Sequence, residues 1–600
     1  MSEVAGRPPR ASISPREALD WLRRPGPSVV LGLALMALLG YGKAVAVWRT
    51  GIFFDTDDAM RLVQLRDWQA GQAFGDLVQH RMDPPTGVAM HWSRVVDLPL
   101  AALLTAFSAW LGPDVGARAT RLAFPALVAA IYLTLLVALA RRLTDARGGL
   151  VAVLIAVCAI ATNHQFDPGR IDHHAPQIAL MLAMALGMIV ALDPARPRAG
   201  AAAGLAAALS LAISVENVPF IAAAGLVFGL AAVISTARAP AAALFGGALA
   251  IGAALAHAFF AVDPAARACD AFSLFHLSAA IGGGGGLVAL ALAARAGAAP
   301  AVRAGLAALI GLGLALALGR AFPACLGSPL ADLPDELRRH WLDHVTEARP
   351  LSILLARRPD LGLPVAAPIV AGLLAALFAA ARGTGLARAR WAALAALLAA
   401  GLAATFWQVR AASSTLPLAA LAGAFAALAV ADRLAAIDRP LARLAPALAA
   451  APFASLVWLA AIPAPARLAA APAASPAACF APAAYGALAA EPPGIALSSV
   501  DAGAFILAYT RHAALAGAYH RNRVGNLAAI RALMAEPAAA RDIVTRSGAT
   551  FVAICRDLVD VQIYAEDAPA GLAARLMAGE TPDWLERRPG AGPLLVWRVR

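Results

Sequence analysis

The chain has 600 residues, of which 61% are hydrophobic and only 14% are charged, and its formal net charge is +12. Its mean hydropathy is +0.71. An average soluble chain carries about 25% charged residues, so this composition excludes a series of soluble domains and indicates a polytopic membrane protein. The arginines lie mostly in short loops between apolar runs, which fits the positive-inside rule better than a nucleic-acid-binding surface. We therefore expect no nucleic-acid partner.

The N-terminal part begins with an arginine-rich tail at 1–27, which we expect to be cytoplasmic. A long apolar run from about 28 to 48 follows, and no small-residue cleavage site comes soon after it. This pattern is typical of an uncleaved first span rather than a signal peptide. A polar loop at 49–96 then lies on the far side of the membrane.

Three apolar segments, 97–112, 121–140 and 149–162, separate that loop from a second polar loop at 163–174. If all three crossed the bilayer, the two polar loops would lie on opposite sides, and the basic residues after 140 would lie outside. Segment 97–112 is short and opens with an acid and a proline, so we expect it to lie in the outer interface without crossing. Both polar loops are then outside.

The remaining apolar runs are long enough for one crossing each and bring the total to about thirteen spans. They lie near 175–193, 199–214, 218–236, 240–261, 276–295, 303–320, 364–382, 390–407, 414–431 and 446–464. The inner connections that this topology produces are basic, in agreement with the positive-inside rule. We therefore expect a transmembrane domain at 28–464, with outer loops at 49–120, 163–174 and 321–363.

The C-terminal part, 465–600, is predicted to lie outside. It begins with an Ala/Pro-rich stretch at 463–478, which is typical of a linker. From 495 onward, IALSSV, FVAIC and LLVWRV are typical of strands, and NLAAIRALMAEPAAARDIVTRSG of a helical stretch. This small α/β unit cannot hold a large core of its own, so we expect it to dock on the outer loops.

The five cysteines include four on the side that we expect to be oxidising. Cys269 could pair with Cys325 and Cys479 with Cys555, but unpaired small apolar side chains are an equal alternative. Cys158 falls within a predicted span.

The first outer loop contains FFDTDDAMR, which places Asp55, Asp57 and Asp58 just beyond the first span. Three carboxylates in four residues repel one another unless a cation neutralises them, and a hard divalent ion is the usual solution. A solvated acidic loop that ends a helix is the alternative.

The second outer loop contains FDPGRIDHHAPQ, with an Asp-His-His cluster shortly before a span. One carboxylate and two imidazoles suit Mn²⁺, Mg²⁺ or Zn²⁺. Adjacent side chains cannot all face one point, so Asp172 with His174 is the better ligand pair. A helix N-cap beside a surface histidine is the alternative.

Two further charged residues lie at predicted outer ends of spans. Glu347 precedes a return to apolar sequence and could polarise an acceptor or complete a metal shell, although a salt bridge to Arg349 or Arg338 is favoured on sequence alone. Arg410 lies where a cation is costly in lipid and is usually paired with an anion, for which a lipid-linked phosphate is a candidate. Snorkelling to the headgroups is its alternative.

Two other features receive no catalytic role. Glu216 lies in a short outer turn. The glycine run at 282–286 lacks a following lysine, so it predicts close helix packing or a kink rather than a phosphate loop.

Together these loops resemble the catalytic subunit of oligosaccharyltransferases, especially the archaeal and bacterial single-subunit forms, within the GT-C class of membrane glycosyltransferases. The resemblance rests on Asp55 six residues before Arg61, on Pro85, Gly87 and Trp92 in PPTGVAMHW, on GRIDHH, on Glu347 in VTEARP and on Arg410. It implies an all-α polytopic GT-C fold of about thirteen helices with a small C-terminal extracytoplasmic α/β domain.

The resemblance weakens in the C-terminal domain. Where the family has Trp-Trp-Asp-Tyr-Gly, which recognises the acceptor sequon, this chain has Ser499, Val500, Asp501, Ala502 and Gly503. Only Asp501 and Gly503 match, so glycosylation of an Asn-X-Ser/Thr sequon is in doubt. Downstream, the polar and aromatic stretch YTRHAALAGAYHRN, which includes His520, is a candidate for acceptor or donor binding, or for a domain interface.

The resemblance implies a metal-dependent glycosyltransferase that moves a sugar or oligosaccharide from a polyprenyl phosphate or pyrophosphate donor to an acceptor outside the cytoplasm. Asp55, Asp172 and His174 are expected to hold a divalent metal, Mn or Mg, and Arg410 the donor phosphate. Asp57 or Asp58 is expected to orient or deprotonate the acceptor and Glu347 to bind it, with weaker acceptor roles for Trp92, Asp501 and His520. We expect the chain in the bacterial inner (plasma) membrane, with its N-terminus cytoplasmic and its C-terminus periplasmic.

Two alternatives to that activity remain. A transporter or lipid flippase should carry paired ionisable groups near mid-span, whereas here they cluster in outer loops. A degenerate glycosyltransferase kept as a partner subunit is compatible with the lost tryptophans, but the retained acids and histidines argue against it.

Overall fold

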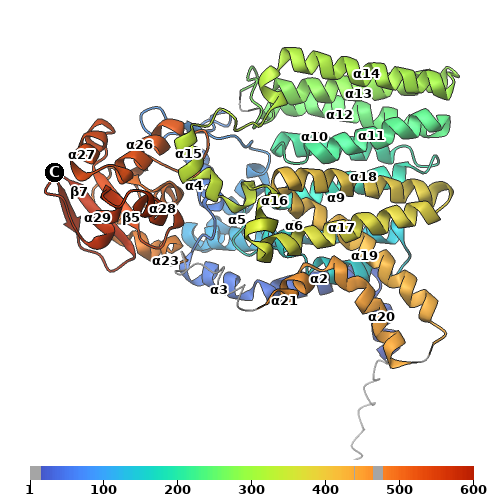
Figure 1. Cartoon of the computed structure of the whole chain (residues 1–600), viewed down its shortest axis with the longest axis horizontal. Helices are drawn as coiled ribbons and strands as arrows, with labels where there is room; N and C mark the ends of the chain where they lie inside the picture. The colour runs from blue at the N-terminus through green and yellow to red at the C-terminus, as the bar shows by residue number, and fades with distance from the viewer. Residues whose placement is uncertain (1–14, 262, 438, 464–476) are drawn as a thin grey trace, which may run out of the picture.

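The computed structural model describes residues 15–261, 263–437, 439–463 and 477–600. Figure 1 shows a bundle of long helices with a small α/β domain seated against one end of it. The expected fold class, a polytopic helical protein with a C-terminal α/β domain, is confirmed. The linker expected at 463–478 lies almost wholly outside the described residues.

Eight helices in the described part of the chain are long and apolar enough to cross a membrane. They are α6 (Pro113–Leu143), α9 (His174–Ala191), α12 with its preceding turn (Thr236–Phe260), α13 (Leu274–Arg295), α14 (Pro300–Ala321), α17 (Pro359–Arg382), α18 (Gly385–Trp407) and α19 with its preceding turn (Val409–Leu434).

Two further candidate spans, the first and the last in the chain, are sharply bent. The first consists of α2 (Pro25–Leu39) and α3 (Tyr41–Thr50), which meet at 62°. At the bend, a Cβ on Gly40 would lie only 2.7 Å from a Pro168 ring carbon, so the turn packs directly on the second outer loop. The last combines α20 (Pro440–Ala450) with α21 (Ser455–Ala461) at 86°.

Three predicted spans correspond to shorter helices: α7 (Gly148–Ala156), α10 (Ala199–Ile213) and α11 (Val218–Ile234). The helix predicted over 149–162 ends early because the Asn163 amide donates to the carbonyls of Ala156 and Val157, at 3.2 and 2.5 Å, and caps α7. A separate short helix, α8 (Ile160–His164), follows.

Segment 97–112 forms α5 (Asp97–Leu111), which packs along the first part of α6. Its first residue is fully buried, and the Asp97 carboxylate binds Arg61 at 2.6 Å and Arg94 at 3.1 Å. The far end of α5 exposes Trp110 and Leu111. An anchored polar start and an exposed apolar end fit the interfacial position expected from the sequence.

The charged connections divide between the two ends of the bundle. The N-terminal segment, the α6–α7 turn and the α18 start lie at one end, because Arg141 donates to the Arg23 carbonyl at 3.2 Å and Arg390 to the Arg142 carbonyl at 3.5 Å. The three polar loops and the α/β domain gather at the other end, on the left in Figure 1. This is the separation that the predicted topology requires.

The glycine run 282–286 lies inside the unbroken helix α13 and faces its neighbours closely. A Cβ on Gly284 would lie 2.3 Å from the Gly246 carbonyl of α12, and one on Gly286 would lie 2.5 Å from Ile310 of α14. Close packing of three helices therefore accounts for the run.

The α/β domain contains a five-stranded sheet of order β4-β3-β5-β7-β6, with β3, β4 and β5 parallel and β6 and β7 antiparallel to their neighbours. The predicted strands are β3 (Ile495–Ser498), β5 (Phe551–Cys555) and β7 (Leu594–Val599). The predicted helical stretch forms α26 (Arg523–Met534) and α27 (Pro537–Arg546), because proline starts a new helix. The strands β4 (Ala513–Ala514) and β6 (Leu585–Arg588) were not predicted, nor were α25 (Gly503–Tyr509), α28 (Val559–Asp567) and α29 (Leu572–Ala578).

The domain docks on the outer loops through buried polar contacts. The Tyr509 hydroxyl accepts from the Phe53 amide at 2.9 Å, and the Tyr519 hydroxyl donates to the Thr56 carbonyl at 3.1 Å. Arg81 of the first loop donates to three carbonyls of the domain. Docking on the loops, which was expected from the small size of the domain, is therefore observed.

Both cysteine pairs considered from the sequence form disulfides. Cys269–Cys325 joins the segment before α13 to the start of the long outer loop, and Cys479–Cys555 ties the beginning of the α/β domain to β5. Cys158 is free.

Replacing Cys479 and Cys555 by serine should lower the free energy of unfolding of the α/β domain by about 2–5 kcal/mol, because a bridge closing a long loop restricts the unfolded chain. Pulse proteolysis of the full chain in detergent, with cleavage followed in the domain, measures this change. Cys158→Ser is the matched control. Equal protection of the double variant and the control would contradict the prediction.

Candidate functional site

The first outer loop positions its acids by starting a helix. The Asp55 carboxylate caps α4 (Thr56–Gln69) by accepting from the Asp57 amide at 2.8 Å. Asp57 and Asp58 then occupy the first turn. The Asp58 side chain is buried and accepts from the amides of Ile171 and Asp172 at 2.7 and 3.1 Å. Asp58 thus joins the first loop to the second.

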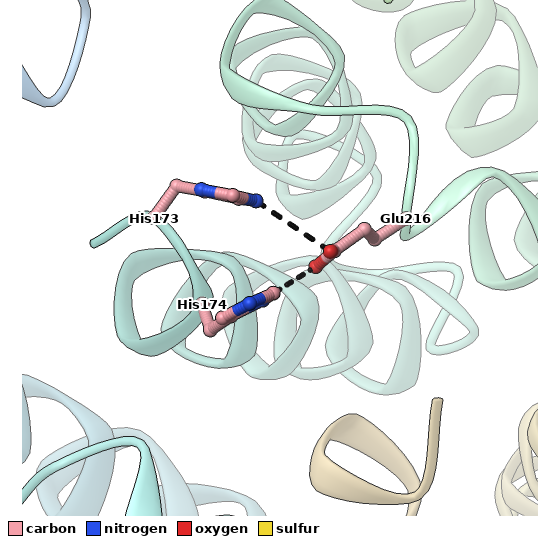
Figure 2. Close-up of side chains that lie close together, drawn as sticks. All are labelled: His173, His174 and Glu216. Carbon is pink, nitrogen blue, oxygen red and sulfur yellow. Dashed lines mark hydrogen bonds and ion pairs between the residues drawn. The ribbon is translucent and has the colours of Figure 1, made fainter. Parts of the chain in front are cut away.

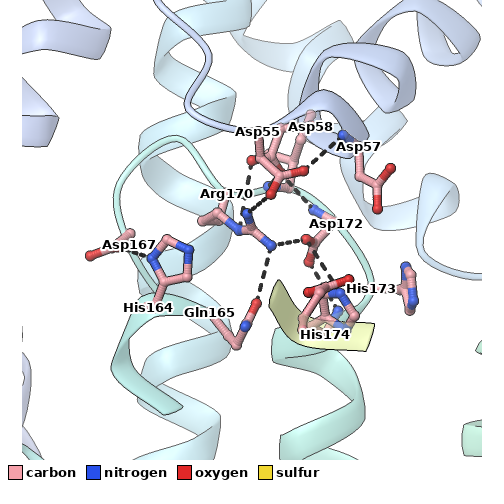
Figure 3. A network of polar contacts seen from close by, with 12 residues as sticks. Asp55, Asp57, Asp58, His164, Gln165, Asp167, Arg170, Asp172, His173 and His174 are labelled. Carbon is pink, nitrogen blue, oxygen red and sulfur yellow. Dashed lines mark hydrogen bonds and ion pairs between the residues drawn. The ribbon is translucent and has the colours of Figure 1, made fainter. Parts of the chain in front are cut away.

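A buried guanidinium lies among these acids, as Figure 3 shows. Arg170 donates to Asp55 Oδ2 at 2.6 Å and to Asp172 Oδ2, and its Nε lies 3.7 Å from Asp58 Oδ2. Gln165 accepts from the same guanidinium at 3.1 Å. Arg170 was not singled out from the sequence, although it stands in the motif GRIDHH.

Burial and neighbouring charges give the acids of this cluster different pKa values. Burial opposes ionisation of Asp172, but Arg170 and the two histidines hold its pKa well below the usual range. Burial raises the pKa of Asp58 to about 7, although Arg170 partly offsets it. Burial and the neighbouring carboxylates raise the pKa of Asp57 well above its usual value. Asp172 is therefore anionic at neutral pH, whereas Asp57 binds a proton more tightly than an ordinary aspartate does.

Two adjacent imidazoles converge on Glu216 (Figure 2). His174, the first residue of α9, places Nδ1 3.0 Å from Glu216 Oε2, and His173 places Nε2 3.5 Å from Oε1. Although burial opposes ionisation of Glu216, His174 and His173 hold its pKa well below the usual range. Among the described residues, these three form a group whose ligand atoms lie within 4.8 Å of one another.

The importance of Glu216 was missed in the sequence. It stands in a four-residue turn between α10 and α11, and it was given no role there. The sequence did contain a signal for it. An unpaired carboxylate in a turn between two spans, at the membrane surface, has a high free-energy cost, so Glu216 was bound to have a partner.

Glu347 and Arg410 meet at this site rather than making the local pair that the sequence favours for Glu347. Arg410 Nη2 lies 3.1 Å from Glu347 Oε1, and its Nη1 lies 3.5 Å from Glu216 Oε1. The Val409 amide donates to the Arg349 carbonyl at 2.9 Å, which holds the long loop against the start of α19. Arg410 Nε is buried and has no hydrogen-bond partner among the described residues.

Two cavities share a wall at this point. The larger has a volume of about 710 Å³ and the smaller about 340 Å³. Both are lined by Asp57, Trp341, Val345, Glu347, Arg410 and Ala518. Asp55 and His174 face the larger cavity, and His173 and Glu216 face the smaller.

An apolar groove of about 640 Å³ continues from the smaller cavity along α11, α13 and α14. The two hollows share Val218, Phe275 and His276 in their linings. A polar cavity at the end of the bundle thus adjoins a groove between apolar helices.

The three residues expected to bind an acceptor lie in different places. Asp501 lines the larger cavity, and His520 lines the smaller one, where its Nε2 lies 2.6 Å from Asp270 Oδ2. Trp92 lines none of the three hollows described above. It is buried in the first loop, donates to Gln64 and packs on Arg61 and Tyr519.

The residues expected to hold a metal offer suitable donor atoms, but in the described part of the chain it is His173, His174 and Glu216 whose ligand atoms lie within 4.8 Å of one another. Three carboxylates, on Asp55, Asp58 and Asp172, surround the single guanidinium of Arg170, so negative charge remains when they are ionised. His174 directs Nδ1 to Glu216 and leaves Nε2 4.0 Å from Asp172 Oδ2. Metal-binding histidines usually orient themselves through such a carboxylate on the second nitrogen. The group of His173, His174 and Glu216 is the competing ligand set.

Comparisons with known proteins identify the fold. No protein-family model matches the chain, and no curated protein matches it in sequence. Among solved structures, it is similar to the oligosaccharyltransferase AglB of the archaeon Archaeoglobus fulgidus in complex with an inhibitory peptide and a dolichol-phosphate. The TM-score is 0.66 at 15% identity, over 91% of this chain and 71% of that one.

Two further structures of the Archaeoglobus fulgidus enzyme are similar. One is tethered to an acceptor peptide containing the NVT sequon, with a TM-score of 0.65 at 15% identity, over 97% of this chain and 75% of that one. The other is a complex with Zn and sulfate, with a TM-score of 0.62 at 15% identity, over 91% and 70% of the chains. The chain therefore has an oligosaccharyltransferase-like GT-C fold.

Replacing Glu216 by Gln should weaken binding of Mn²⁺ about 10- to 100-fold, because loss of the carboxylate releases the ring of His174. Isothermal titration of the purified chain with Mn²⁺ measures the affinity, and Glu580→Gln, at an exposed surface pair, is the control. His173→Asn separates the two ligand sets, and we expect it to change the affinity less than twofold. A loss through His173→Asn as large as that through Glu216→Gln would instead assign the metal to His173, His174 and Glu216.

Proposed function

We propose that this protein is a metal-dependent membrane glycosyltransferase that transfers a sugar or oligosaccharide from a polyprenyl-(pyro)phosphate donor to an extracytoplasmic acceptor. The observation that carries the proposal is the wall of Asp57, Glu347 and Arg410 between two cavities, one of which adjoins an apolar groove. Such a wall gives a lipid-borne donor and a separate acceptor access to the same acids. The dolichol-phosphate and acceptor peptide of the similar archaeal structures support both kinds of ligand.

The donor is assigned to the smaller cavity and the groove. A polyprenyl chain is apolar and needs a path within the bilayer. The groove is lined by the candidate spans α13 and α14 and by the shorter apolar helix α11. Its phosphate needs cationic donors at the end of that path. Arg410 lies there, with Nε free of other partners among the described residues.

Arg410 is held in place by two carboxylates that also hold other parts of the site. Glu347 and Glu216 each contact one terminal nitrogen of its guanidinium. Glu216 also contacts His174, so the phosphate-binding arginine and the proposed metal ligand share one anchor. A planar guanidinium so fixed binds phosphate oxygens with defined geometry.

The proposed metal ligands are Asp55, Asp172 and His174, for Mn²⁺ or Mg²⁺. What a divalent ion supplies there, when bound, is neutralisation of the charge that develops on the leaving phosphate. Arg170 holds Asp55 and Asp172 in position, and Asp58 fixes the backbone of Asp172. One of the similar archaeal structures is a complex with Zn and sulfate, which supports a divalent ion in a protein of this fold.

Asp57 and Glu347 are assigned to the acceptor. Both line the two cavities, so an acceptor in the larger cavity meets them beside the donor. A carboxyl with a pKa raised by burial and neighbouring charges is suited to taking a proton near neutral pH, which is the role proposed for Asp57. Glu347 would orient the acceptor group.

A transporter or flippase is not favoured. The acids, histidines and arginine described above gather at one end of the bundle, between the α/β domain and the spans. We propose that this end faces the periplasm of a bacterial inner membrane, because the opposite end carries the basic connections.

Transfer from a radiolabelled polyprenyl-linked sugar to envelope acceptors should be abolished by EDTA and restored by Mn²⁺ or Mg²⁺. The double variant Asp172→Ala, His174→Ala should lower the rate at least about 100-fold, because the charge on the leaving phosphate is no longer neutralised. Asp76→Ala, His80→Ala removes an Asp–His pair outside the site and is the control. Full activity of the first double variant in EDTA would refute the metal assignment.

Arg410→Lys should lower kcat/KM for the donor about 10- to 100-fold, because an ammonium replaces several charged hydrogen bonds by one point charge. Steady-state kinetics at varied donor concentration measures the loss, and Arg357→Lys on an exposed helix face is the control. An unchanged kcat/KM would remove Arg410 from the donor site.

A further inference from the structure

The larger cavity has an unusual polar lining for a substrate site, because most of its charged groups are carboxyls. The carboxyls belong to Asp55, Asp57, Glu347, Asp360, Asp501 and Asp560. Among the described residues that line the cavity, Arg410 is the one arginine. Asp360 is neutralised outside the cavity by Arg358 at 2.8 Å. Those of the remaining acids that are ionised repel a phosphorylated or carboxylated acceptor.

Two of these carboxyls form a pair on the α/β domain. Asp560 accepts from the Asp501 amide at 2.9 Å through Oδ2, and from its own neighbour, the Val561 amide, at 2.9 Å through Oδ1. Asp560 is thus fixed beneath Asp501, and both line the cavity. Nothing in the proposed transfer uses this pair.

The protonation of the two carboxyls lets the pair both donate and accept hydrogen bonds. Burial, and then the charge of Asp560, raises the pKa of Asp501 well above its usual value. Burial raises the pKa of Asp560 to about 6. A carboxyl that keeps its proton offers one O–H donor, and its neighbours offer acceptor oxygens. A hydroxyl group, which both donates and accepts, matches such a pair.

Aromatic rings cover another part of the same cavity. Phe54, Phe480 and Trp341 line the cavity, and Phe505, which is fully buried, stacks against Phe480 with ring centroids 5.0 Å apart and an interplanar angle of 27°. Flat apolar faces beside hydrogen-bonding carboxyls suit a ligand that has apolar C–H faces and a rim of hydroxyls. A pyranose ring has this form.

We propose that the larger cavity binds the acceptor as a neutral, hydroxyl-rich carbohydrate, with Asp501 and Asp560 holding its hydroxyls. The inference rests on the proposed function and names the acceptor class of that site. One acceptor hydroxyl oxygen forms the new bond to C1 of the donor sugar as the bond from C1 to the phosphate oxygen breaks. The hydroxyl proton passes to Asp57, and the polyprenyl (pyro)phosphate leaves with the bonding electrons.

A peptide acceptor fits this lining less well. Peptide carbonyls need hydrogen-bond donors, and a protonated carboxyl offers only one, whereas an ionised carboxylate offers none. Ser499 and Val500, which precede Asp501, are both fully buried in the domain and neither lines the cavity. The site therefore lacks side chains at the positions from which a sequon hydroxyl would be held in the family that the sequence resembles.

The test uses the full chain in nanodiscs, applied to an array of neutral oligosaccharides, anionic glycans, amine-bearing glycans and peptides with Asn-X-Ser/Thr or Ser/Thr. We expect binding to neutral oligosaccharides, weakened about tenfold or more by Asp501→Asn and by Trp341→Phe, which alter the cavity from two separate elements. Asp542→Asn, on an exposed face of the same domain, should bind as the wild type does. Thermal unfolding of each variant shows that it is folded.

Binding to peptides or charged glycans in place of neutral ones, or to nothing on the array, overturns the acceptor assignment. So does equal glycan affinity in the Asp501→Asn and Asp542→Asn variants. Turnover of the labelled polyprenyl-linked donor by the wild-type protein is measured in parallel. Donor turnover without glycan binding refutes only the acceptor class, whereas absence of donor turnover refutes the proposed function itself.

Discussion

The burial of several carboxylates around one guanidinium, at the end of a helix bundle, is the constraint on which the site depends. Arg170 contacts Asp55, Asp58 and Asp172, which come from two loops more than 100 positions apart in the chain. Buried charges are tolerated only when they are paired and hydrogen-bonded, so the two loops can fold only against each other. The α/β domain then covers the same acids through Tyr519 and Tyr509. Fold and site are thus one electrostatic arrangement.

This arrangement also explains how a site can serve two substrates with different solubility. Glu216 links His174 to Arg410, and Arg410 links Glu216 to Glu347, so a chain of ion pairs crosses the wall between the cavities. On one side an apolar groove leads toward the spans, and on the other a carboxyl-lined cavity lies under the α/β domain. The proposed donor and acceptor therefore approach the acids from opposite sides of one wall.

Much of the fold could be predicted from the sequence because membrane spans and positive-inside loops leave strong patterns. Hydropathy located the helices, and the prediction that 97–112 lies at the interface without crossing rests on parity. The bend at Gly40 was missed because it depends on packing against Pro168, which is distant in the sequence. The early end of α7 was missed because it depends on hydrogen bonds from the Asn163 side chain to nearby backbone carbonyls. The bend after Phe453 was also missed. Short strands such as β4 were missed because two residues carry no periodicity.

The site was predicted in part, for a similar physical reason. Charged and titratable side chains near the membrane have a free-energy cost unless they have partners or a function. Five of them therefore stood out, and the structure brings them together: Asp55, Asp172, His174, Glu347 and Arg410. Arg170 and Glu216 did not stand out, because only the folded structure shows which charged residues they pair with. Trp92 is buried and lines none of the three hollows, and a motif match alone does not tell a buried indole from one that faces a cavity. Gly503 has a packing role, because a Cβ there would lie 1.8 Å from the Ala516 carbonyl.

The central claim is that a lipid-borne phosphate reaches Arg410 through the groove between α11, α13 and α14. Cryo-electron microscopy of the full chain in nanodiscs with Mn²⁺ and a non-transferable polyprenyl phosphonate tests it most directly. The account predicts phosphonate density in contact with Arg410 and prenyl density along the groove beside Val218 and Leu314. Prenyl density in the carboxyl-lined cavity, or phosphonate density away from Arg410, would contradict it.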